Sequence, residues 1–135
     1  MPNIADELAA ALTPAGKAVL EWLGPVEWVD DAGFDRRLRP LLVDEQTHWL
    51  SEAVGRHDRP SCYLDRAAAL SLIIDRLIRK LASWARHRHV EMYLEPSWPC
   101  GWKIDIFGTP GASSRKSELL DVLLDVAAQV MEIEA

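Results

Sequence analysis

Apolar residues recur at helical spacing along the middle of the chain, at positions 64, 67, 70, 74, 77, 78, 81 and 84. Polar and charged side chains, among them Asp75 and Ser83, fill the opposite face. A period of about 3.6 residues over this length predicts a long amphipathic helix. The helix ends in basic residues, where cations suit the negative end of the helix dipole: Arg86, His87, Arg88 and His89.

Two further helical segments are predicted before this one. Asn3 can cap a first helix, and Thr13 followed by Pro14 is typical of a second start, with Gly24 and Pro25 as the stop. Residues 4–23 are therefore expected to form two short helices or one kinked helix. Residues 26–35 are expected to form a connection, whose last residue, Asp35, can cap the next helix. From Arg36 or Pro40 onward, apolar residues at 38, 41, 42, 49, 50 and 53 favour another main helix that ends before Gly55.

The period changes to two after residue 89. Val90, Met92 and Leu94 alternate with polar residues, and so do Trp102, Ile104 and Ile106. This predicts a β-hairpin, which must lie against helices or gain another strand, because an isolated hairpin is marginal in water. Residues 108–114 are expected to be a loop, and residues 115–133 a final helix. The predicted fold class is α+β, mostly helical with four to five helices, with one antiparallel hairpin between the third main helix and the C-terminal helix.

Length and composition favour one ordered domain over residues 1–135. The chain is 49% hydrophobic and 27% charged, which is typical of globular proteins. Its N-terminus is acidic, and no apolar run reaches the length of a membrane span, so a cytoplasmic location is expected. Cys62 and Cys100 form no C-x-x-C motif, and we expect both thiols to be reduced.

The net charge of −6 is distributed unevenly along the chain. Residues 1–55 carry −6, residues 56–89 carry +5 and residues 90–135 carry −5. The basic middle part offers a candidate nucleic-acid or small-ligand site, formed by Arg76, Arg79, Lys80, Arg86, His87, Arg88 and His89. The same residues also suit the solvated or internally paired polar face of an amphipathic helix, which is the interpretation we favour.

Residues able to support catalysis or metal binding are scattered. His87, His89, Cys62 and Cys100 are zinc-ligand types, but their spacing matches no zinc motif, and we expect neither a metal nor a cofactor. Cys100 lies in a Pro-Cys-Gly turn, yet no base is identifiable beside it. The sequence contains no nucleophile elbow, phosphate loop or metalloprotease motif. A non-enzymatic role is therefore the favoured expectation.

Trp98 is the aromatic residue that the pattern sets apart. It is one of six tryptophans and lies at the predicted hairpin tip between Ser97 and Pro99. It either stays exposed as a binding anchor or folds back onto Trp102 or a helix. We predict a partner-binding surface that combines the hairpin tip with an acidic region: Trp98, Pro99, Trp102, Glu27, Asp30, Asp31 and Asp35.

The resulting functional hypothesis is a small acidic protein-interaction domain, such as an inhibitor, immunity or anti-defence protein, that binds a basic surface of another protein. Electrostatic steering would speed that encounter. The alternative is a nucleic-acid- or small-ligand-handling protein, an enzyme subunit or a regulator, that uses the His/Arg cluster at residues 86–89. A homodimer is also predicted, formed through an edge strand of the hairpin or the wide apolar face of the last helix. No membrane partner is expected.

Overall fold

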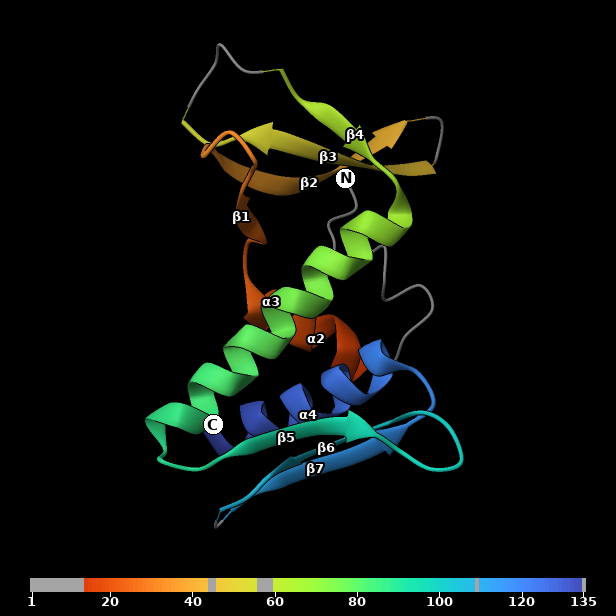
Figure 1. Cartoon of the computed structure of the whole chain (residues 1–135). Helices are drawn as coiled ribbons and strands as arrows, with labels where there is room; N and C mark the ends of the chain where they lie inside the picture. Colours follow the sequence, from red (N-terminus) through yellow and green to blue (C-terminus); the bar gives the residue numbers. More distant parts are fainter. Residues whose placement is uncertain (1–13, 44–45, 56–59, 109, 135) are drawn as a thin grey trace.

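The computed structural model describes residues 14–43, 46–55, 60–108 and 110–134. Within these ranges it contains three helices and seven strands in two antiparallel sheets (Figure 1). The helices are α2 (Pro14–Leu23), α3 (Arg66–His87) and α4 (Leu119–Glu134). The N-terminal sheet is formed by β1 (Glu27–Val29), β2 (Asp35–Val43), β3 (Gln46–Ala53) and β4 (Cys62–Leu64), in that order. The C-terminal sheet is formed by β5 (Met92–Pro96), β6 (Trp102–Ile106) and β7 (Ala112–Lys116).

The prediction of a mostly helical fold with four to five helices is wrong. The segment expected to be a helix between Arg36 and residue 54 forms the β2–β3 pair, in which Val43 lies opposite Gln46 and Arg36 opposite Ala53. Leu38 is buried between two exposed arginines, Arg37 and Arg39, which is the alternation of a half-buried strand.

Asp35 was expected to cap that helix and instead begins β2. The connection expected over residues 26–35 contains β1, which pairs with β2 through the register Trp28↔Arg36.

The long amphipathic helix is confirmed as α3. The side chain of Asp65 caps it by accepting a hydrogen bond from the amide of Ala68 at 2.7 Å, and Arg86 and His87 lie in its last turn. The start at Pro14 and the stop at Gly24 are also confirmed, as the ends of α2. The helix predicted over residues 4–12 lies outside the described residues.

The predicted hairpin is confirmed as β5 and β6, with Leu94 opposite Ile104. A third strand, β7, extends it, so part of the expected 108–114 loop and the first residues of the expected last helix are extended chain. The last helix consequently begins at Leu119 rather than Arg115. Because β6 is now a central strand, only β5 of the original pair keeps an edge.

A single hydrophobic core joins both sheets. In Figure 1, α3 runs diagonally from the N-terminal sheet to the C-terminal sheet, and α4 covers one face of the latter. The buried stripe of α3 repeats every four residues, at Ala69, Ile73, Leu77, Leu81 and Ala85. It shares one cluster of buried residues with Leu38 and Trp49 of the N-terminal sheet and with Ile104 of the C-terminal sheet. The long helix therefore connects the two ends of the molecule through continuous packing.

Candidate functional site

The loop between β5 and β6 presents Trp98 to solvent. Its side chain is 88% exposed, so it does not fold back onto Trp102, which is half-buried and packs against the core. The amide of Ser97 donates a hydrogen bond to the carbonyl oxygen of Gly101 at 3.0 Å and closes the base of the loop. Pro99 and Cys100 are also exposed. The hairpin tip therefore ends in an accessible indole on an anchored loop.

Gly101 explains how this loop is held. Its φ of +100° is in the region that favours glycine, and a Cβ here would lie 2.5 Å from the carbonyl oxygen of Lys116. The loop thus packs directly on the backbone at the end of β7. Such close contact restricts the loop and lowers the entropy that ordering Trp98 in a complex would cost.

Two of the four predicted acidic contact residues form ion pairs within the N-terminal sheet. Oε1 of Glu27 accepts hydrogen bonds from Nε and Nη2 of Arg37 at 3.0 and 2.7 Å. Asp30 pairs with Arg36 at 3.0 Å, while its Oδ1 accepts from the amides of Ala32 and Phe34. These carboxylates hold the β1–β2 connection together.

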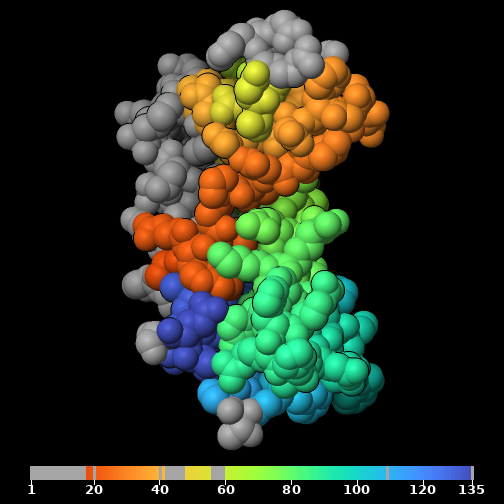
Figure 2. Space-filling model, turned by 90° about the vertical axis from the view of Figure 1, so that its left-hand side faces the viewer, coloured from red at the N-terminus to blue at the C-terminus, as the bar shows by residue number. Residues whose placement is uncertain are grey.

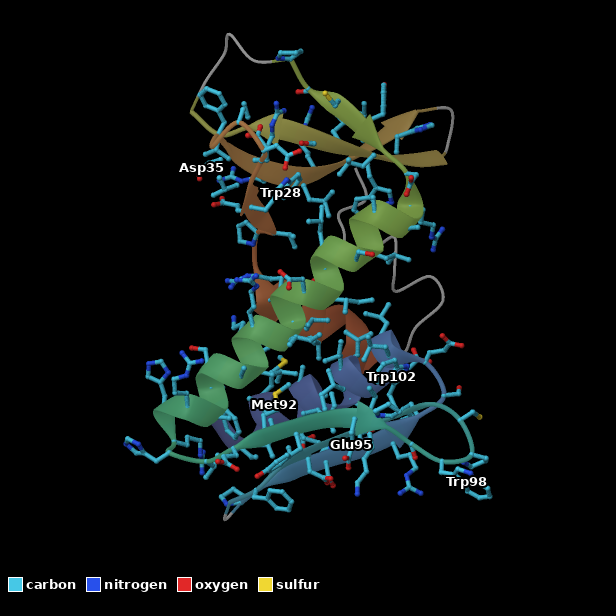
Figure 3. The ribbon with its side chains drawn as sticks, in the orientation of Figure 1. Trp28, Asp35, Met92, Glu95, Trp98 and Trp102 are labelled. Atoms are coloured by element: carbon cyan, nitrogen blue, oxygen red, sulfur yellow. The ribbon has the colours of Figure 1, made fainter. Side chains whose placement is uncertain are left out.

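The pKa of the Asp30 carboxyl lies below its ordinary value of 3.8, mainly because the amide of Phe34 donates to it and further because of the Arg36 guanidinium. Asp31 and Asp35 are exposed at the same end of the molecule. Figure 3 shows Asp35 and Trp98 at opposite ends, on different sheets. The hairpin tip and the acidic region therefore do not form one continuous surface.

Several of the predicted basic residues have partners inside the chain. Nε of Arg79 pairs with Asp75 at 2.9 Å, and the Arg88 guanidinium lies 4.8 Å from the ring centroid of Trp84. Nδ1 of His87 donates to the carbonyl oxygen of Ser83 at 2.7 Å. Arg86 and His89 are exposed at the end of α3. The seven basic residues thus occupy a partly paired helix face.

Lys80 connects α3 to α2. Its Nζ donates to the carbonyl oxygen of Trp22 at 2.7 Å and lies 4.0 Å from the centroid of the same indole. Burial is the main cause that lowers the pKa of Lys80, and the positive charge of Arg76 lowers it further, against a smaller opposing effect of Glu134. Lys80 therefore contributes to the packing of α3 on α2.

Two hollows flank Arg76 and Arg79. The first, of about 550 Å³, is bounded by Trp22, Lys80, Ser83, Trp84, His87 and Glu134. The second, of about 660 Å³, lies between β1 and α3 and is lined by Pro25, Val26, Glu27, Trp28, Val29, Leu72, Asp75, Arg76 and Arg79. We call the second the β1–α3 groove. The sequence pattern missed it, because residues 26–35 were interpreted as a connection and nothing placed them beside residue 76.

No metal centre emerges from the described residues. In these ranges no three His, Cys, Asp or Glu side chains come together as metal ligands. Cys62 and Cys100 are free and exposed; Cys62 begins β4, whereas Cys100 lies in the loop between β5 and β6. Over the same part of the chain, no helix is long and apolar enough to cross a membrane.

Comparisons with known proteins give no assignment: no protein-family model, curated protein or solved structure matches this chain. The candidate sites therefore stand on their geometry. The strongest are the exposed Trp98 loop at one end and the β1–α3 groove toward the other.

Proposed function

We propose that this chain is a non-enzymatic protein-interaction domain whose main anchor is Trp98. The supporting observation is the 88% exposure of a large aromatic side chain on a loop held by Gly101. Large exposed aromatics that are restrained before binding are the side chains that dominate interface energies. The inhibitor, immunity and anti-defence proteins are the functional classes that this proposal includes.

The chemistry of the loop defines the expected partner. Pro96, Pro99 and Cys100 are exposed around Trp98, so the partner should offer an apolar pocket for the indole. The chain carries a net charge of −6, and Asp31 and Asp35 add exposed carboxylates at the opposite end. A basic partner would therefore be attracted at long range and would dock at the tip.

The proposal places the domain in the cytoplasm. Both cysteines are exposed and unpaired, and a reducing compartment would keep them so.

The alternative, in which the His/Arg cluster at residues 86–89 handles nucleic acid or a small ligand, has less support. His87 and Arg88 already contact Ser83 and Trp84. Arg86→Ala and Arg88→Ala test it, because phosphate contacts would make the lost affinity depend on salt.

The decisive experiment is affinity capture from lysate with the wild type, Trp98→Ala and Tyr63→Ala in parallel. Tyr63 is a matched control, since it is a 67% exposed aromatic on the other sheet. We expect one stoichiometric protein to be captured by the wild type and by Tyr63→Ala. For Trp98→Ala, its affinity should fall by about 2 kcal/mol or more, as for a hot-spot residue.

Two results would contradict the proposal. The first is a partner that Trp98→Ala binds as tightly as the wild type does. The second is an eluate that stains for nucleic acid, contains no protein partner and is lost in Arg86→Ala, which would favour the alternative.

A further inference from the structure

The outer edge of β1 has main-chain groups that no other described strand uses. The amide of Leu38 donates to the carbonyl oxygen of Val26, and the amide of Asp30 donates to the carbonyl oxygen of Phe34. In an antiparallel ladder, hydrogen-bonded and non-hydrogen-bonded pairs alternate. Glu27↔Arg37 and Val29↔Asp35 are therefore non-hydrogen-bonded pairs, and the amides and carbonyls of Glu27 and Val29 point away from β2.

This edge borders the β1–α3 groove. Glu27, Trp28 and Val29 form one wall, while Leu72 and Arg76 of α3 form the other. Figure 2 faces this side of the molecule, where the orange atoms of β1 and β2 meet the green atoms of α3. Val29 is 63% exposed, so a chain can approach the edge from solvent. An added strand would lie against both the unused main-chain groups and the helix.

The charge of the groove favours an acidic occupant. Glu27 forms an ion pair with Arg37, and Asp75 forms one with Arg79. Arg76, in contrast, forms no ion pair with any described residue. With Glu27 and Asp75 each in an ion pair, Arg76 leaves the groove with a positive charge in a chain whose net charge is −6.

The spacing of Leu72 and Arg76 along α3 matches the spacing of side chains on one face of a strand. Leu72 and Arg76 are one helical turn apart, which is a rise of about 6 Å. Residues that share a face of a strand lie about 6.6 Å apart. An extended segment can therefore place an apolar side chain on Leu72 and, two residues away, a carboxylate on Arg76.

We propose that the β1–α3 groove binds an extended acidic segment of a partner protein, which adds to β1 as a fifth strand of the N-terminal sheet. Main-chain hydrogen bonds to Glu27 and Val29 supply affinity, and Leu72 and Arg76 select an apolar residue followed at the second position by an acidic one. This site is separate from the Trp98 loop and does not depend on it.

The test uses a fluorescein-labelled peptide of about seven residues, in which threonine alternates with valine around one central glutamate. A second probe carries lysine in place of glutamate. By fluorescence anisotropy, the wild type should bind the acidic probe at least tenfold more tightly than the lysine probe. Arg76→Glu should reverse this preference, and rising salt should reduce it.

The strand pairing is tested by Val29→Pro. It removes an outward amide while leaving the ladder to β2 intact, and proline is tolerated on such edges. We expect binding to weaken at least tenfold. An acidic probe N-methylated at alternate amides makes the same test from the ligand side with the unaltered protein. Arg115→Glu on the C-terminal sheet and Trp98→Ala are the controls and should bind normally, which separates this site from the proposed function.

Three outcomes would overturn the proposal. The first is that neither probe binds, and the second is that the acidic and lysine probes bind equally tightly. The third is an affinity that neither N-methylation nor a folded Val29→Pro variant reduces. Slowed hydrogen exchange of the Val29 amide in the complex, with the Ser113 amide unchanged, would support pairing at β1.

Discussion

Gln129 of α4 bonds both main-chain groups of Ser113 in β7. Its Nε2 donates to the Ser113 carbonyl oxygen at 2.8 Å, and its Oε1 accepts from the Ser113 amide at 3.1 Å. A single side-chain amide thus takes the place of a neighbouring strand on the outer edge of the C-terminal sheet. Open edges invite pairing with other chains, so this contact protects β7. Among the described residues, no side chain bonds the outward main-chain groups of Glu27 and Val29 in β1 in this way.

Gln129→Ala should uncover the β7 edge. We expect a loss of about 1 kcal/mol in the free energy of unfolding, because two partly exposed hydrogen bonds disappear, together with self-association that grows with protein concentration. Urea unfolding and sedimentation velocity measure the two effects. Glu132→Ala, an exposed change on the same helix, is the control. A variant that stays as monomeric as the wild type would show that Gln129 does not protect the edge.

Gly101→Ala should destabilise the chain by about 2–3 kcal/mol. The methyl group would lie 2.5 Å from the Lys116 carbonyl oxygen, and alanine is strained at a φ of +100°. Gly55→Ala is the matched control, because Gly55 has a φ of +71° but open space around it, so only the backbone cost of about 1 kcal/mol applies. Equal losses in urea unfolding would show that the contact with Lys116 is not significant.

The elements with an unambiguous period were predictable from the sequence. Leu77 and Leu81 repeat at helical spacing through α3, and Leu94 and Ile104 alternate with polar residues in β5 and β6. The β2–β3 pair was missed because its apolar residues also fit a helix. Pro40, which lacks an amide hydrogen, argued only against a helix that begins at Arg36, because proline suits the first turn of one that begins at Pro40. In β2 it lies opposite Trp49.

The candidate sites also differ in how far the sequence could predict them. A proline-flanked tryptophan at a hairpin tip has little chain nearby to cover it, so the sequence could single out Trp98. The acidic contact residues were predicted from composition alone. Composition cannot show that Glu27 and Asp30 form ion pairs with Arg37 and Arg36 of the neighbouring strand. The β1–α3 groove depends on contacts between segments more than 40 residues apart, which no local pattern encodes.

Lys80→Met should loosen the packing of α2 on α3. Methionine retains an apolar stem of similar length but loses the hydrogen bond to the Trp22 carbonyl oxygen and the cation–π contact with its ring. We expect a loss of about 1–2 kcal/mol in the free energy of unfolding. Urea titration followed by tryptophan fluorescence measures it. Arg86→Met, at an exposed position of the same helix, should change stability by less than about 0.5 kcal/mol.

Asp30 should make stability depend on pH in the acid range. Its pKa in the folded chain lies below the ordinary 3.8, so the unfolded chain binds the proton more tightly. The stabilisation is therefore complete above pH 3.8 and is lost as pH falls through the lower, folded-state pKa. Asp30→Asn keeps an acceptor for the Phe34 amide but removes the charge beside Arg36.

The variant should consequently be less stable than the wild type at pH 7, and the difference should narrow as urea unfolding is repeated at successively lower pH below 3.8. Asp31→Asn, an exposed neighbour, controls for the general loss of one negative charge. If the difference between Asp30→Asn and the wild type stays constant across the acid range, the carboxylate is not stabilised in the folded chain. The β1–β2 connection would then depend on main-chain hydrogen bonds alone.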